Sequence, residues 1–220
     1  AYTPVEIARR VEAAGETKAR MALLPLAMLS VLAGAFIGLG AMLSVMVRAD
    51  ASLGFAASTF LSGLVFSLGL LMVVVAGAEL FTGNNLLVMA WADRRISTAQ
   101  VLRNWGVVCL GNLVGAVGLA WLVWASGHTG MNAGAVGQKV VQIALAKQDL
   151  PLWTAFWRGM LCNILVCMAV WMAMGGRSVV DKLVAVVFPI TAFVAAGFEH
   201  SIANMYLMPQ AMLLDRKSVV

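Results

Sequence analysis

The chain has 220 residues, of which 62% are hydrophobic and only 11% are Asp, Glu, Lys or Arg. This composition excludes most soluble folds. The formal net charge is +5. The basic residues lie mainly beside apolar runs, so the charge indicates membrane topology and not a nucleic-acid partner.

Four stretches carry no Asp, Glu, Lys or Arg, namely 21–47, 51–78, 104–138 and 159–176. Each is close to or longer than the roughly 20 apolar residues that a helix needs to cross a bilayer. Their residues do not alternate between polar and apolar, as the strands of a membrane barrel do. The sequence therefore predicts an all-α, polytopic membrane protein that lies in the lipid bilayer as a single domain, 1–220.

Residues 1–20 are amphipathic and of mixed charge, which predicts a surface helix and not a cleavable signal. Nine basic residues lie in this segment and in the loops near 94–103 and 177–182, against six in the remaining loops. The positive-inside rule then places the N-terminal helix in the cytoplasm. The expected crossings are 21–47, 56–92, 104–125, 154–174 and 182–214.

The second and fifth crossings are interrupted by polar residues, at 79–85 and 197–204. Glu79 and Asn84 have the same five-residue spacing as Glu199 and Asn204, 120 residues later, which indicates a weak internal repeat. Two interrupted helices in corresponding halves are typical of a transport site. The half-helices that follow the breaks would turn their positive N-terminal ends toward an anion.

His200 is the only histidine expected at membrane depth. A buried histidine can be a satisfied structural donor, but a position at a helix break favours a role facing a pore. Glu79 and Glu199 are interpreted as structural acceptors for loop amides, and Asn84 and Asn204 as groups that can satisfy the broken backbone.

The sequence excludes the main enzyme classes, because it lacks a Ser-His-Asp set, His-Glu-x-x-His, a phosphate loop and Gly-x-Gly-x-x-Gly. A single intramembrane histidine does not suit a haem, and no metal site or cofactor is expected. A carrier or channel remains. The alternative from a different class is a membrane scaffold or sensor that transports nothing.

Four segments resemble the formate–nitrite transporter family: 77–84, 111–115, 161–167 and 197–205. The resemblance implies an aquaporin-like, six-helix protomer with an inverted repeat. It further implies an inner-membrane homopentamer with a separate pore in each protomer for small monovalent anions such as formate or nitrite.

The resemblance also assigns roles to single residues. His200 becomes the central pore histidine, held near Thr82 and Asn163, through which transport could be linked to protons. Lys147 gives the outer vestibule a positive potential. Four apolar side chains form the constrictions on either side of the histidine: Phe66, Leu70, Leu80 and Phe193.

Segments 161–172 and 176–182 are most similar to the formate branch, whereas Gly83-Asn84-Asn85 is more similar to nitrite or hydrosulfide members. Formate is therefore the expected substrate, with nitrite or hydrosulfide as the alternatives. The family has six crossings and the chain stops after the fifth. The sixth, with a second Gly-Asn-x-x-Gly element, is expected to be absent from it.

Overall fold

The computed structural model describes residues 1–215, which contain nine α-helices, two short 3₁₀ helices and no strand. The prediction of an all-α fold is thus confirmed. Four helices are long and apolar enough to cross a membrane, by length and composition. They are α2 (Leu23–Arg48), α3 (Phe55–Ala76), α5 (Thr98–Ala125) and α7 (Leu152–Met174).

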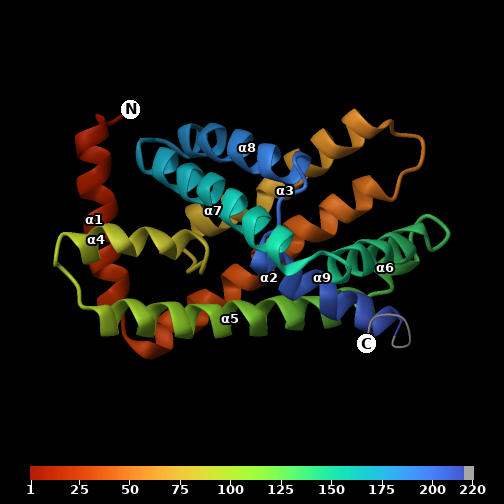
Figure 1. Cartoon of the computed structure of the whole chain (residues 1–220), viewed down its shortest axis with the longest axis horizontal. Helices are drawn as coiled ribbons and strands as arrows, with labels where there is room; N and C mark the ends of the chain where they lie inside the picture. Colours follow the sequence, from red (N-terminus) through yellow and green to blue (C-terminus); the bar gives the residue numbers. More distant parts are fainter. Residues whose placement is uncertain (216–220) are drawn as a thin grey trace.

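The N-terminal helix α1 (Pro4–Arg20) lies across the ends of the other helices, at the left of Figure 1. It begins with a capping box, in which Thr3 and Glu6 satisfy each other's backbone N–H groups. Val11, Gly15 and Ala19, spaced four residues apart, are its buried residues. This narrow apolar stripe docks α1 on the short helix α4 (Leu87–Ala92).

Helices α2 and α5 lie so close together that glycine is required between them. A Cβ atom on Gly34 would collide with the carbonyl oxygen of Asn112, and one on Gly115 with the carbonyl oxygen of Val31. Both obstacles are backbone atoms, so no side-chain rotation relieves them. Gly34 and Gly115 therefore serve packing within one chain.

Two helices end early and leave a break before the chain continues as a second helix. Helix α3 ends at Ala76 and is capped by Gly77, and α8 (Val179–Ala195) is followed closely by Gly197. Both glycines have positive φ, 75° and 71°, a backbone conformation that L-residues with side chains rarely adopt. After the breaks come a 3₁₀ helix, Gly83–Leu86, with α4, and helix α9 (Ser201–Leu214).

Helix α6 (Ala135–Gln148) occupies the polar stretch between the third and fourth crossings, where the sequence analysis placed no helix. A 3₁₀ turn, His128–Gly130, precedes it. Val136, Val140 and Ala144 are its buried residues, and the helix packs on α9. Figure 1 shows α6 and the last turns of α9 at the end of the molecule opposite α1.

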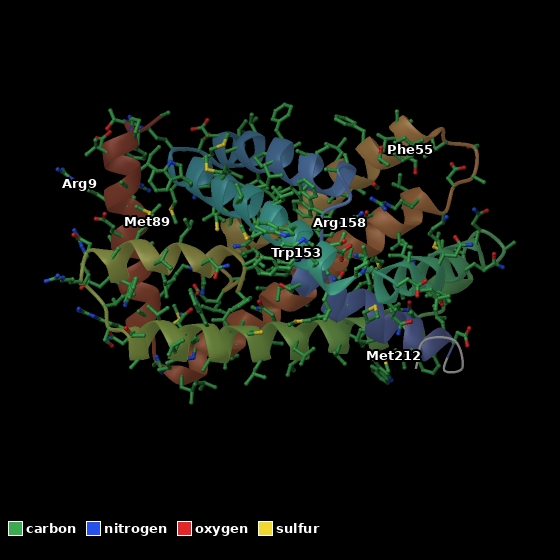
Figure 2. The ribbon with its side chains drawn as sticks, in the orientation of Figure 1. Arg9, Phe55, Met89, Trp153, Arg158 and Met212 are labelled. Carbon is green, nitrogen blue, oxygen red and sulfur yellow. The ribbon has the colours of Figure 1, made fainter. Side chains whose placement is uncertain are left out.

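The labelled side chains of Figure 2 mark the same two ends of the molecule, the end with α1 and the end opposite it. In Figure 2, Arg9 of α1 lies at one end and Phe55, at the start of α3, at the other. Trp153 and Arg158 lie near the middle of the view, where α7 begins. The two breaks lie between these ends of the helical bundle.

Candidate functional site

The fold brings the two breaks together, although 118 residues separate their central side chains. The hydroxyl oxygen of Thr82 lies 3.2 Å from Nε2 of His200. Both residues are buried, with 6% and 4% of their surface exposed. The candidate site is therefore built from one residue of each break.

The backbone fixes which nitrogen of His200 carries the proton. His200 is the N-cap of α9, and its Nδ1 accepts a hydrogen bond from the backbone N–H of Ala203 at 3.1 Å. An acceptor nitrogen in a neutral imidazole leaves the other nitrogen protonated. Nε2–H is therefore the donor, and it donates to Thr82. A second proton on Nδ1 would break the bond to Ala203.

Two phenylalanines surround the imidazole. The ring of Phe193 stacks on His200 with centroids 5.7 Å apart and planes inclined by 17°. Phe66 meets Phe193 edge to face at 5.6 Å, and its centroid lies 6.2 Å from that of His200. The three rings come from α3, α8 and the second break, so packing holds the imidazole in one orientation.

A cavity of about 250 Å³, which we name the Lys147 cavity, ends at these rings. His200, Phe66 and Phe193 line it from one side. Its charged lining residues are three cations and one carboxylate: Arg48, Lys147, Arg158 and Glu199. The surplus of positive charge favours an anion in this cavity.

A second cavity of about 190 Å³, the Lys18 cavity, ends at Leu70 and Leu80. Lys18 and Lys182 supply positive charge to its lining, and Glu79 is the one carboxylate there. The two cavities share no lining residue. Phe66 and Leu70 lie four residues apart on α3, about 6 Å along the helix axis, so little more than one helical turn separates the cavities.

A closed network ties the first break to α1. The ammonium group of Lys18 donates to Glu79 Oε1 at 2.8 Å and to Asn84 Oδ1 at 3.0 Å. The Asn84 amide donates to Glu79 Oε2 and to Asn104 Oδ1. Asn112 accepts from the N–H of Phe81 and donates to the carbonyl of Glu79.

The second break has a similar but smaller network. The ammonium group of Lys147, on α6, donates to Glu199 Oε2 at 2.5 Å. The Asn204 amide donates to the same oxygen at 2.9 Å. Glu79 and Glu199 thus accept bonds from lysine and asparagine side chains, where the sequence analysis expected loop amides.

Asn163, expected near the histidine, hydrogen-bonds Cys167 on its own helix at 3.6 Å. The thiol of Cys167 in turn donates to the carbonyl of Thr82 at 3.7 Å. Within residues 1–215, no hydrogen bond joins Asn163 to His200, and the buried Oδ1 of Asn163 has no partner. Asn163 therefore reaches the first break only through Cys167.

The comparisons with known proteins agree with this architecture. The model of the formate/nitrite transporter family matches residues 5–219. The chain belongs to the formate/nitrite transporter family. Members of this family are transporters and channels, in agreement with the prediction that the chain is not an enzyme, and the chain is a membrane protein.

Two relatives illustrate the similarity of sequence. The formate channel FocA of Haemophilus influenzae is 40% identical over 97% of this chain and 75% of its own length. The FocA channel of Escherichia coli K12 is 39% identical over 96% of this chain and 74% of its own length. The resemblance inferred from the four sequence segments is confirmed.

Two solved members of the formate/nitrite transporter family share the fold. A pentameric formate channel with formate bound is 34% identical and superposes with a TM-score of 0.80, over 86% of this chain and 75% of that one. An ion channel of the family is 31% identical, with a TM-score of 0.89 over 98% of this chain and 87% of that one.

Sequence reasoning missed four residues of the site: Lys18, Arg48, Asn104 and Asn112. Lys18 lies in the last turn of a helix that was predicted, so its place directly before a crossing was a usable signal. The partners of Asn104 and Asn112 come from α1, α2 and the first break. No spacing in the sequence predicts those contacts.

Proposed function

We propose that the chain forms a channel for small monovalent anions, with formate as its main substrate. The observation that carries the proposal is the pair of cavities that approach each other from opposite ends of the molecule and stop on either side of a thin apolar barrier. Both cavities are lined by more cations than carboxylates. The names of the relatives and of the solved pentamer support formate as the substrate and a homopentamer as the assembly.

In this proposal the Lys18 cavity opens to the cytoplasm and the Lys147 cavity to the outside of the inner membrane. The excess of basic residues near α1, at 94–103 and at 177–182, supports this orientation. An anion that enters either cavity meets a positive potential. It then meets the apolar barrier formed by Phe66, Phe193, Leu70 and Leu80, with His200 and Thr82 between its two sides.

His200 is proposed to donate its Nε2 proton in a hydrogen bond to the passing anion in place of Thr82. A bare anion in a dry constriction loses several kcal/mol of hydration, and a hydrogen bond from a preoriented donor offsets part of that cost. Proton-linked transport would require a second proton on the ring. The bond from Ala203 to Nδ1 opposes that proton, so neutral His200 is the resting form.

Formate flux into liposomes that contain the full chain tests the proposal. We expect influx above that of protein-free liposomes, inhibited by nitrite and hydrosulfide in proportion to their own transport. Faster transport of nitrite or hydrosulfide than of formate would transfer the assignment to that anion. No flux of any of the three would refute the channel and favour a scaffold or sensor.

A further inference from the structure

Arg48, the last residue of α2, is a cation of the Lys147 cavity that has no role in the proposed pathway so far. Its Nε donates to the Ser62 hydroxyl at 3.2 Å, and its Nη2 donates to the carbonyl of Val194 at 3.2 Å. Among residues 1–215, no carboxylate lies within salt-bridge distance of its guanidinium group. The Arg48 charge is therefore not neutralised, whereas Lys147 in the same cavity is paired with Glu199.

One stripe of α2 leads from Arg48 into the cavity. Ala41, Ser44, Val45 and Arg48 all line it, and the spacing of three and four residues puts them on one helix face. The same cavity ends at His200. An anion held at Arg48 is thus already in the space that leads to the imidazole.

The chemistry of the guanidinium group selects a particular shape of anion. Arginine has five N–H donors in a planar fork, and the bonds to Ser62 and Val194 use two of them. Because those bonds hold the group in place, the remaining donors are oriented before the anion arrives. A planar oxyanion with two acceptor oxygens can bind to the fork through both oxygens, but a nearly spherical anion gains only the charge.

We propose that Arg48 is a selectivity residue, which binds planar oxyanions, small monocarboxylates above all, at the mouth of the Lys147 cavity. The inference rests on the proposed anion transport and adds to it a reason for preferring formate over hydrosulfide. The planar fork of donors distinguishes Arg48 from Lys147, because the ammonium group of Lys147 acts as a point charge.

A structural role for Arg48 makes a different prediction. The same two hydrogen bonds join the end of α2 to α3 and α8, and a cation in the last turn of a helix also stabilises the helix dipole. If Arg48 only joined helices, its replacement would lower the amount of folded protein or the maximum rate for every anion alike. Only a binding role changes the preference between anions.

The test measures uptake of formate and of hydrosulfide by cells that lack their own transporters and express the full chain. Arg48→Gln removes the charge and the fork, and Arg48→Lys removes the fork alone. Lys139→Gln is the matched control, because Lys139 lies on α6 but does not line the cavity. The readout is the half-saturating concentration of each anion, with the amount of folded protein measured in parallel.

For Arg48→Gln we expect the half-saturating formate concentration to rise about tenfold and that of hydrosulfide about threefold. Arg48→Lys should raise the value for formate about threefold and leave that for hydrosulfide unchanged. Lys139→Gln should leave both within about twofold of wild type.

An unchanged ratio between the two anions in both variants would overturn the inference while leaving formate transport intact. If neither variant accumulated as folded protein, Arg48 would be a structural residue and the inference would also fall. If wild type carried neither anion, the proposed function and the inference would fail together.

Discussion

The two breaks share the side chains that hold their backbone in place and differ in the residue that follows the glutamate. In each, a glutamate accepts a bond from a lysine on a helix outside the crossings, Lys18 of α1 or Lys147 of α6. The same glutamate also accepts a bond from the asparagine five residues later. The residue directly after the glutamate is Leu80 in the first break and His200 in the second. The two breaks thus share the groups that hold the backbone and differ in the side chain that lines the neighbouring cavity, Leu80 in one and His200 in the other.

The breaks also differ in how firmly they are held. At the first, Asn84 uses both amide atoms and Asn112 bridges the break to α2. At the second, Oδ1 of Asn204 is buried without a partner in the described part of the chain, 1–215. The first break thus has the more completely paired network, and the imidazole of His200 belongs to the other break.

The largest expected effect is on helix packing, where a tightly packed glycine is compared with a loosely packed one. Gly34→Ala on α2 places a methyl group against the backbone of α5, and because neither helix can yield locally, we expect a loss of about 3 kcal/mol or more. Gly159→Ala on α7 is the matched control, since its Cβ would lie 3.9 Å from the Glu199 carbonyl oxygen. Thermal unfolding in detergent measures the loss of stability in both variants. Equal losses in Gly34→Ala and Gly159→Ala would contradict the account.

The two lysine networks predict a smaller difference. Glu79 is 3% exposed and Glu199 is 12% exposed, so removal of the lysine strands a more deeply buried charge at the first break. We expect Lys18→Met to cost about 3 kcal/mol and Lys147→Met about 1 kcal/mol. Lys139→Met serves as the control. If Lys147→Met lowered the free energy of unfolding as much as Lys18→Met, the ranking would be refuted.

The smallest effect concerns the starts of α1 and α6. The backbone N–H and hydroxyl of Thr3 donate to Glu6 and hold the pKa of that carboxyl below its usual 4.5. A lowered pKa stabilises α1 above pH 4.5, and the contribution is lost as the pH falls through the lower, folded value. Helix α6 has no side-chain cap bond, so its first turn should not respond.

Hydrogen exchange measures this difference. At about pH 6 the first turn of α1 should be better protected in wild type than in Glu6→Gln, and at about pH 3 the two should match. The first turn of α6 should be the same in both proteins at both values. An advantage of wild type that persisted at the lower pH would show that the charge of Glu6 is not its source.

The four long apolar helices and the positions of both breaks could be predicted from the sequence, because long apolar runs and their polar interruptions are local features. The five-residue spacing of Glu79 and Asn84, repeated at Glu199 and Asn204, even indicated which segments correspond. Helix α6 was missed because it is short and of mixed polarity. Its buried spacing of four, at Val136, Val140 and Ala144, was a weak signal that pointed to a helix.

Contacts between distant segments could not be read in this way. The pairing of Thr82 with His200 entered the sequence analysis only through the family resemblance, and the cap bond from Ala203 did not enter at all. Arg48 was counted only as a basic residue in a loop. Its place in a cavity depends on how α2, α3 and α8 pack, which no single segment encodes.

The most direct test of the account compares formate flux through wild type and two His200 variants in liposomes at several pH values. His200→Asn can still cap α9 but has no imidazole, and His200→Phe keeps a ring that can stack on Phe193 but has no donor. If the imidazole is the donor at the barrier, both variants lose most of the flux at every pH. Wild type and both variants with the same flux at every pH would contradict the central role of His200.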